Sequence, residues 1–422
     1  MTAEVLVINA NAVALAADSA VTIGFGKKIY NSAIKVFSLS KHEPVGVMIY
    51  GNADIMGVPW EIVIKMFRQF IGINSHDKLE QYGEILINFL HDNANIFTDK
   101  IKRTWFHNNV MAYFIGIASE IAEIMSEREA GGDGHNNSID NPLEQVAEER
   151  LQQVLTQDFI EGFDEKSINE IKSYYSDELE KAYCSVFNDK LSSENKSRLI
   201  DLAAEVHARR IFSNGHTGIV VCGYGNLDIF PVAATYNIDG IVLDRVRYSK
   251  NKVKSHRMEH GNDCAIIPLA QEDMMASFME GINPLVKAYI DDKLSNLRNT
   301  LPSMAENCFS SNTGTNAFTK HLSEEVDLLQ KDVEYYIREM HVKPIIDMVK
   351  VLPKEELAAM AESLVNLTAF KRRMSNELET VGGPIDVAVI SKGDGFVWIK
   401  RKHYFDPDLN HQFFANYFSK GA

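Results

Sequence analysis

Strand-like apolar runs stand near both ends of this chain, and long stretches of helical periodicity separate them. Strand patterns fill residues 3–54 and return at about 217–248 and 385–400. The residues between them repeat their apolar positions every three or four residues, as amphipathic helices do. Because no strand–helix unit repeats along the chain, this order predicts an α+β fold and not a doubly wound α/β fold.

Two hairpins are expected at the N-terminus. Residues 4–8 and 12–17 are apolar runs joined by an asparagine-rich turn. Residues 34–39 and 45–50 form a second pair with a polar segment between them. A helix then begins at Pro59, a residue that suits the first turn of a helix. Later strands are expected at 217–222, 229–236, 240–248, 385–391 and 395–400.

These patterns divide the chain into five segments. We predict a first part of a core (1–73), a helical insertion (74–212), a second part of the core (213–300), a helical region (301–376), and closing strands with a C-terminal tail (377–422). The helical stretches have amphipathic patterns of their own. We therefore expect the first of them to fold as a self-packed subdomain inserted between core elements.

The composition excludes several classes of partner. The formal net charge of −15 argues against binding to nucleic acid or to an anionic membrane. No apolar stretch approaches the ~20 residues that span a bilayer, and the N-terminus lacks the basic segment of a signal peptide. The cysteines are scattered and typical of reduced thiols: Cys184, Cys222, Cys264 and Cys308. We expect a cytoplasmic protein.

Three local motifs favour ordinary structural roles over ligand sites. Residues 24–28 are glycine-rich and basic, but they lack the spacing and the Ser or Thr of a phosphate-binding loop, which favours a solvated turn. His256 and His260 are four residues apart, a spacing that suits zinc on a helix, but a glycine follows at once. The basic run 245–254 favours a solvated strand edge or an intersubunit contact. We predict no metal and no nucleotide.

Thr2 has a chemically useful position. Removal of Met1 would leave both a hydroxyl and a free α-amine on this residue. The amine, with an ordinary pKa near ~8, could take the proton of the hydroxyl at neutral pH and so activate a weak nucleophile. A nearby lysine would keep the amine neutral, and a carboxylate would hold the lysine. The alternative is that Thr2 is simply the first residue of a strand, and its position alone favours that alternative.

The segments that follow Thr2 carry a family resemblance. Asp18 lies in the segment Ala-Asp-Ser-Ala-Val-Thr, and Lys35 opens the next predicted strand. Gly51 ends the strand after that, and a Gly-Gly pair at 382–383 precedes a closing strand. In these features the chain resembles the N-terminal nucleophile hydrolases, in particular the proteasome β-subunits and the bacterial HslV peptidase. The resemblance covers residues 2–70, 215–290 and 380–400.

The resemblance implies a four-layer αββα sandwich and a threonine peptidase or amidohydrolase. In its mechanism Thr2 Oγ attacks an amide, the Thr2 amine moves the proton and Lys35 tunes both groups. Asp18 anchors Lys35, and the Gly51 N–H stabilises the oxyanion. No metal or organic cofactor is implied. The substrate would be a peptide or another amide, and the chain would form a homo-oligomer; whether an unfoldase or regulator joins it stays open.

Two departures from the family pattern keep other functions open. Leu378 and Val381 stand where the family has an Asp and a Ser, and no serine follows the predicted strand near 265–271. One alternative is therefore an inactive proteasome-like subunit that acts as a scaffold or regulator. Another is a small-molecule amidase whose helical insertions cap the pocket. A predicted helix with excess apolar residues supports oligomerisation in each case: Met274, Met275, Phe278 and Met279.

Overall fold

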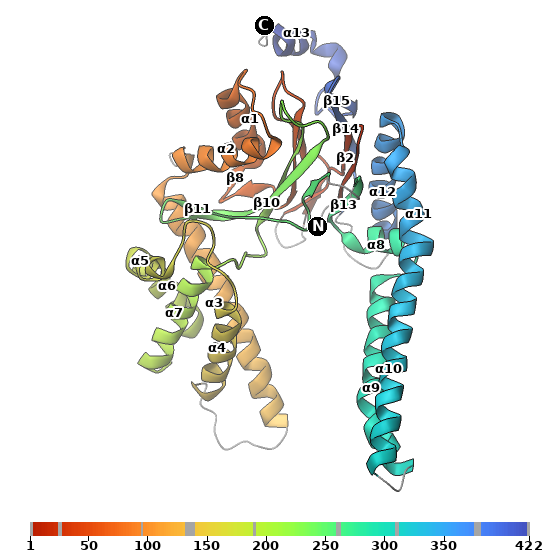
Figure 1. Cartoon of the computed structure of the whole chain (residues 1–422). Helices are drawn as coiled ribbons and strands as arrows, with labels where there is room; N and C mark the ends of the chain where they lie inside the picture. The colour runs from red at the N-terminus through yellow and green to blue at the C-terminus, as the bar shows by residue number, and fades with distance from the viewer. Residues whose placement is uncertain are drawn as a thin grey trace. The chain divides into compact units, whose positions relative to one another are not determined.

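The chain forms two compact units, seen in a computed structural model (Figure 1). The structure describes residues 3–23, 28–93, 96–130, 140–188, 191–258, 263–308, 312–374 and 381–419. Unit 1 comprises Met1–Val36, Ile229–Val232 and His256–Ala422, and unit 2 comprises Phe37–Asp228 and Ala233–Ser255. Each unit contains an antiparallel sheet and helices, so the predicted mixed α+β class is confirmed.

The sheet of unit 1 joins the two ends of the chain. Its strand order is β13 (Cys264–Ala270), β1 (Glu4–Asn9), β2 (Val13–Ala17), β14 (Asp386–Ser391) and β15 (Gly395–Lys400), and all neighbours are antiparallel. The predicted N-terminal hairpin is therefore present as β1 and β2. Asn9 holds its turn, because Asn9 Oδ1 accepts the N–H groups of Asn11 at 2.9 Å and Ala12 at 3.3 Å.

Helices cover one face of this sheet. They are α8 (Glu272–Glu280), α11 (Lys343–Val351) and α12 (Lys354–Arg373). Alternate residues of β1 and β2 point to them, and many are alanines, which allows α12 to approach the strands closely. The shared apolar core includes Ala3, Val5, Val7, Ala14, Ala16, Leu357, Ala361 and Val365. All residues of β1 and β2 are buried, which explains why their sequences are apolar almost without alternation.

A long helical hairpin also belongs to unit 1. It consists of α9 (Pro284–Cys308) and α10 (Asn312–Ile337), and a π-helical turn (Arg338–Val342) leads on to α11 (Figure 1). Arg298 Nη1 lies 3.0 Å from Asp327 Oδ1 across the hairpin. Many large apolar side chains of the hairpin and of the π-helical turn are exposed, among them Leu285, Val286, Tyr289, Leu328, Leu329, Val333, Tyr335, Tyr336 and Met340. The remaining elements are β3 (Val21–Ile23), β4 (Lys28–Tyr30), β12 (His256–Arg257), a 3₁₀ turn (Pro407–Leu409) and α13 (His411–Ser419).

The sheet of unit 2 has the strand order β11 (Arg245–Lys250), β10 (Val232–Val242), β9 (Thr217–Gly223), β6 (Val45–Gly51) and β5 (Val36–Ser38). The sequence predicted a break in β10 before Gly240, and this was wrong. The strand continues to Val242, and the turn is Leu243–Asp244, with φ of 51° and 60°. Gly240 serves packing and not a turn, because a Cβ there would lie 2.6 Å from the indole of Trp105.

Helices make up most of unit 2. α1 (Trp60–Ile71) begins after Pro59 as predicted, and α2 (Leu79–Asp92) follows. The others are α3 (Asp99–Ala130), α4 (Asp140–Leu155), α5 (Glu165–Tyr174), α6 (Ser176–Phe187) and α7 (Ser193–Ala208). The last five share an apolar core in which the rings of Phe106 and Tyr175 stack with centroids 4.0 Å apart. This helical core explains the amphipathic patterns of the sequence.

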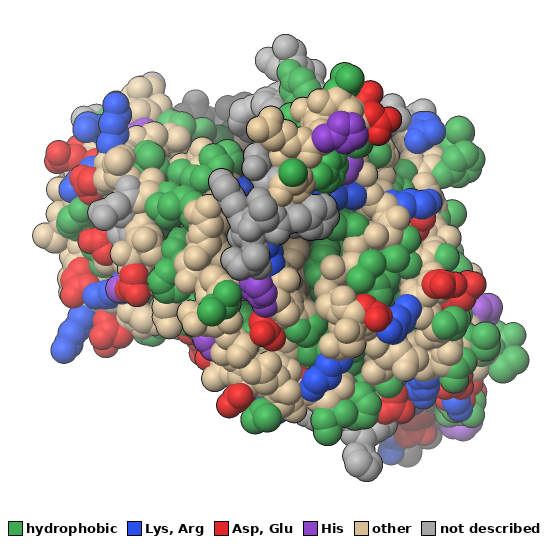
Figure 2. Space-filling view, turned by 90° about the horizontal axis from the view of Figure 1, so that it is seen from above, with side chains coloured by type: hydrophobic (Ala, Val, Ile, Leu, Met, Phe, Trp, Pro, Cys, Tyr) green, Lys and Arg blue, Asp and Glu red, His purple; other side chains and the backbone are tan. Residues whose placement is uncertain are grey.

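The surface agrees with the composition. On the face shown in Figure 2, acidic and basic side chains are intermixed, so the excess negative charge is not concentrated there. Among the helices that the structure describes, none is long and apolar enough to cross a membrane. Cys184, Cys222 and Cys264 are free thiols. Burial raises the pKa of both the Cys222 and the Cys264 thiol, which makes them unreactive.

Candidate functional site

Lys35 lies between two carboxylates in unit 1. Lys35 Nζ is 2.5 Å from Asp18 Oδ1 and 3.1 Å from Glu4 Oε1. The exposed fractions of the three side chains are 6% for Lys35, 1% for Asp18 and 0% for Glu4. Buried charges are stable only when they are paired and hydrogen-bonded, so each of these groups depends on the others. We call Glu4, Asp18 and Lys35 the lysine cluster.

Asp18 is the centre of the lysine cluster. Asp18 Oδ1 accepts the N–H of Ala3 at 3.1 Å in addition to the Lys35 ammonium. Asp18 Oδ2 accepts the N–H groups of Gly382 at 2.9 Å and Ala20 at 3.3 Å. The carboxylate therefore ties together the start of β1, the segment before β14, and the residue that precedes β5. Its position is fixed by the backbone as well as by Lys35.

The paired glycines pack against the same region. The Ser19 N–H donates to the Gly382 carbonyl at 3.2 Å, and Ser19 Oγ donates to the Pro384 carbonyl. Gly383 has φ of +78°, and a Cβ there would lie 2.7 Å from Asn31 Cβ. Only glycine fits both the conformation and the space. The Gly-Gly segment is thus required locally for the close approach of three chain segments around Asp18.

Glu4 is the member of the lysine cluster that sequence reasoning missed. It opens β1, a strand that is otherwise apolar up to Ile8 and buried along its whole length. A carboxylate in such a strand needs a cationic partner, because a buried unpaired charge is strongly unfavourable. That rule could have identified Glu4 as a residue with a cationic partner, although it would not have revealed that the partner is Lys35.

The structure does not bring all predicted site residues together. Lys35 and Asp18 are in contact, while their catalytic roles stay a prediction. Gly51 ends β6 and belongs to unit 2, where it pairs with Thr217 of β9. Thr2 lies outside the described residues. It is bonded to Ala3, whose N–H donates to Asp18.

The weaker motifs have mixed outcomes. The predicted solvated strand edge is wrong for Arg247, which is 2% exposed and places Nη1 2.5 Å from Asp239 Oδ2. Residues 24–27 and His260 lie outside the described residues. His256 is buried, and this burial lowers its pKa. Within the described ranges, no group of three or more His, Cys, Asp and Glu side chains could hold a metal ion.

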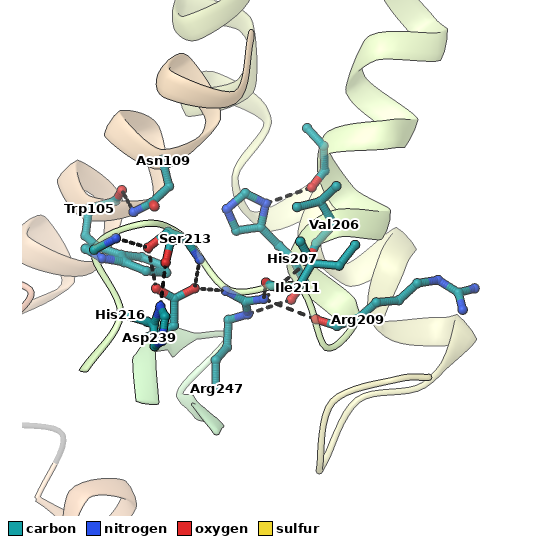
Figure 3. Close-up of polar contacts among 12 residues, drawn as sticks. Trp105, Asn109, Val206, His207, Arg209, Ile211, Ser213, His216, Asp239 and Arg247 are labelled. Carbon is teal, nitrogen blue, oxygen red and sulfur yellow. Dashed lines mark hydrogen bonds and ion pairs between the residues drawn. The ribbon is translucent and has the colours of Figure 1, made fainter. Parts of the chain in front are cut away.

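Arg247 instead organises the segment between α7 and β9 (Figure 3). Its Nε donates to the carbonyl of His207 at 2.9 Å, and its Nη2 donates to that of Ile211 at 2.7 Å. Asp239 accepts from Arg247 and also from Ser213 Oγ at 2.6 Å. Since the guanidinium has a partner on each nitrogen, Arg247 fixes the backbone and is not available to a ligand.

Comparisons with known proteins identify no family for this chain. No family model matches the sequence, and no curated protein matches it. One similar solved structure is Anbu (ancestral beta-subunit) from Yersinia bercovieri, with 9% identity over 99% of this chain and 95% of that chain and a TM-score of 0.27. Another is the helical assembly of the Anbu complex from Pseudomonas aeruginosa, with 8% identity, the same coverage and a TM-score of 0.27.

These results correct the family assignment made from the sequence. The sequence assigned the chain to the N-terminal nucleophile hydrolases, as a proteasome β-subunit or HslV-like member with large helical insertions, and this assignment is wrong. No family model matches, and the similar structures are Anbu proteins at a TM-score of 0.27 and 9% identity. A likeness of that size shows no family. The comparisons establish a weak structural similarity to Anbu and identify no catalytic residue.

Proposed function

We propose that this chain is an amide hydrolase, a threonine peptidase or amidase, whose nucleophile is Thr2 after cleavage of the Met1–Thr2 bond. One observation carries the proposal: the same Asp18 oxygen that binds the Lys35 ammonium at 2.5 Å also accepts the Ala3 N–H at 3.1 Å. Thr2 is bonded directly to Ala3, and consecutive Cα atoms are about 3.8 Å apart, which is why we assign the nucleophile to this residue.

The proposed reaction has two halves. First, the Thr2 α-amine takes the proton of Thr2 Oγ while Oγ attacks the carbonyl carbon of the substrate amide. The resulting ammonium gives this proton to the leaving amine as the C–N bond breaks, which leaves an ester on Oγ. A water molecule then attacks the ester, with the amine again as the base, and releases the carboxylic acid. Gly51 N–H is the proposed oxyanion donor.

The charges of the lysine cluster suit this chemistry. The cluster combines one ammonium with two carboxylates, which leaves one excess negative charge when all three are ionised. Lys35 would stabilise the developing alkoxide, and the excess negative charge would stabilise the ammonium that forms on the amine. Stability alone does not account for the cluster, since apolar replacements of a buried ion pair are often neutral or stabilising.

We also propose that the two sheets form the inner layers of a four-layer αββα sandwich. Support comes from each unit taken by itself, because each contains an antiparallel sheet and helices, the components of one half of such a sandwich. Solution scattering from the full chain, compared with curves calculated for the layered arrangement and for two separated units, tests this. A curve that fits only separated units would contradict it.

An inactive scaffold or regulatory subunit is the second candidate. Val381 favours it, because this residue is fully buried in the apolar core of unit 1 and brings no hydroxyl to a terminal amine. If Met1 remained on the mature chain, Thr2 would carry an amide in place of the basic amine. Intact-mass measurement of the purified protein therefore distinguishes the two candidates.

A covalent probe tests the proposed nucleophile. An epoxyketone, which reacts with both the hydroxyl and the amine of an N-terminal threonine, should add once to the chain. Peptide mapping should place the adduct on Thr2, and Thr2→Ala should abolish it because Oγ is lost. An adduct on another residue, or none on a chain that has lost Met1, would reject Thr2 as the nucleophile.

A further inference from the structure

Unit 2 contains a cavity that the lysine cluster does not use. Its volume is about 910 Å³, and it lies between one side of α3, the end of α7 with the residues that follow it (206–215), and the turn that follows β6. Trp105 and Asn109 of α3 and His207 of α7 line it, and Figure 3 shows these three side chains. Sites that bury a ligand of several residues or a drug-sized molecule have about 300–1,000 Å³. The volume therefore suits a ligand and not only a few water molecules.

One wall of the cavity is preformed. The backbone from Val206 to Ser213 is held by Arg247 and Asp239 through hydrogen bonds to the carbonyls of His207 and Ile211 and to the hydroxyl of Ser213. Trp105 is seated on Gly240 of β10, which leaves no space for a side chain between them. A ligand would meet groups already in position, so little conformational entropy would be lost on binding.

His207 presents a hydrogen-bond acceptor to the cavity. Its side chain is almost fully buried, and its Nδ1 lies 2.7 Å from the Ala203 carbonyl. A carbonyl only accepts, so Nδ1 carries the proton and Nε2 keeps a lone pair. Burial, and secondarily the charge of Arg247, lower the pKa of His207 to about 4, which keeps the ring neutral.

The lone pair of His207 has no partner in the part of the chain that the structure describes. The ring is fixed by Phe106, whose centroid lies 4.6 Å away. Figure 3 shows Nε2 on the side of the ring that faces Trp105 and Asn109. Nearly all buried polar groups have a hydrogen-bond partner, so this nitrogen is suited to a donor on a ligand.

Carboxamides line the rest of the cavity. They belong to Asn52, Asn108, Asn109 and Asn214. Asn109 Nδ2 donates to the Trp105 carbonyl at 3.0 Å, while the side chains of the other three make no hydrogen bond to the described residues. A carboxamide both donates and accepts, which matches the N–H and C=O of another amide. Arg247 of the lining pairs with Asp239, and Arg150 pairs with Glu120 outside the lining. The lining also has one further cation, Lys100, and one further anion, Asp54.

We propose that this cavity binds a neutral ligand through amide groups, with one ligand N–H donating to His207 Nε2 and ligand carbonyls accepting from the asparagines. The ligand class is an uncharged peptide segment or a small carboxamide. The size of the cavity favours the peptide. The proposal stands on unit 2 alone, so it and the chemistry proposed for Thr2 can fail independently.

Ester analogues test the contact with His207. The probes are N-acetyl-tetra-alanine amide, the set of analogues in which each internal amide is replaced in turn by an ester, and acetamide, titrated calorimetrically into the full chain. One ester should bind about 10-fold more weakly than the amide, because it lacks the N–H that His207 accepts. In His207→Phe that ester and the amide should bind equally. Equal binding of every ester and the amide to the unaltered chain would overturn the proposal. If acetamide saturates the cavity and the peptide does not bind, the ligand class is the small carboxamide.

A cavity-filling pair locates the binding. Ala112→Trp adds an indole on the lining side of α3 and should abolish peptide binding. Ser119→Trp adds the same bulk to an exposed position on the same helix outside the cavity and should leave the affinity unchanged. Circular dichroism checks that both variants fold. Unchanged binding in a folded Ala112→Trp chain, or no binding of either the peptide or acetamide to the unaltered chain, would overturn the proposal.

Discussion

At the scale of single residues, both units contain polar side chains that are buried beside charged neighbours. Lys35 and Asp18 are almost completely removed from water, and each binds the other. His207 is equally buried but neutral, because burial and the nearby Arg247 disfavour its protonation. Buried groups are therefore paired with opposite charges in unit 1, while burial in unit 2 leaves His207 as an uncharged acceptor.

The first prediction separates the chemistry of Lys35 from its structural role. Lys35→Met leaves Asp18 and Glu4 buried without their cation, so the free energy of unfolding should fall by about 3–5 kcal/mol. Adding Asp18→Asn and Glu4→Gln removes both charges and should restore much of that loss without restoring hydrolysis. Lys65→Met, which breaks the exposed pair with Glu61, should cost less than about 1 kcal/mol. Denaturant unfolding and amide hydrolysis measure both effects; a triple variant that regains activity would exclude Lys35 from the reaction.

The second prediction concerns pH. The pKa of His207 falls from 6.5 to about 4 on folding, so the unfolded chain binds more protons between these values. The contribution of His207 to stability is complete above pH 6.5 and should be lost progressively, by about 3 kcal/mol, as pH falls to 4. His207→Gln should flatten this part of the stability profile, while His91→Gln at an exposed site should not. An unchanged profile in His207→Gln would contradict the burial argument.

At the scale of elements, the sequence predicts where strands and helices lie better than it predicts which of them pack together. The N-terminal hairpin, the closing strands and the helix after Pro59 follow from periodicity and turn residues. The turn at Leu243–Asp244 was missed because leucine rarely adopts positive φ. That one error also hid the site of Arg247, since only the correct register places it opposite Gly240, beside Asp239. The cavity was missed because its walls are distant in sequence.

A glycine pair tests how the elements pack. Gly240→Ala would place a Cβ 2.6 Å from the indole of Trp105, so the free energy of unfolding should fall by about 1–3 kcal/mol and the tryptophan emission should shift. Gly116→Ala lies inside α3, where the nearest atom to an added Cβ is 3.9 Å away, and should stabilise by up to about 1 kcal/mol. Denaturant unfolding with fluorescence detection measures both changes. Equal effects of the two substitutions would show that Trp105 is not held against β10.

At the scale of the whole molecule, the helical hairpin of α9 and α10 exposes many large apolar side chains. Leu329, Val333 and Tyr336 recur every three or four residues along α10, Met340 follows in the π-helical turn, and each is at least 46% exposed. Large exposed apolar patches on otherwise soluble folds mark interaction sites. The homo-oligomer expected from the sequence therefore has a second candidate interface. In the helix first suggested, α8, Met275 is buried in the core of unit 1, while Phe278 is 42% exposed.

We predict that these hairpins join copies of the chain. Light scattering at micromolar concentration should show an oligomer, and Val333→Glu with Tyr336→Glu should dissociate it, because a charge on each side of the interface cannot be buried without a partner. Val253→Glu, at a residue that is 92% exposed in unit 2, is the control and should leave the mass unchanged. A monomeric unaltered chain would reject the prediction.

The most direct test of the central claim compares two forms of one protein. In one form Thr2 is the first residue, and in the other an uncleavable residue precedes it. The extension converts the α-amine to an amide that cannot act as a base, so hydrolysis of a fluorogenic peptide-amide library should fall by about 10²–10⁴-fold with no change in the circular dichroism spectrum. Equal rates for the two forms would contradict the claim that Thr2 is the nucleophile.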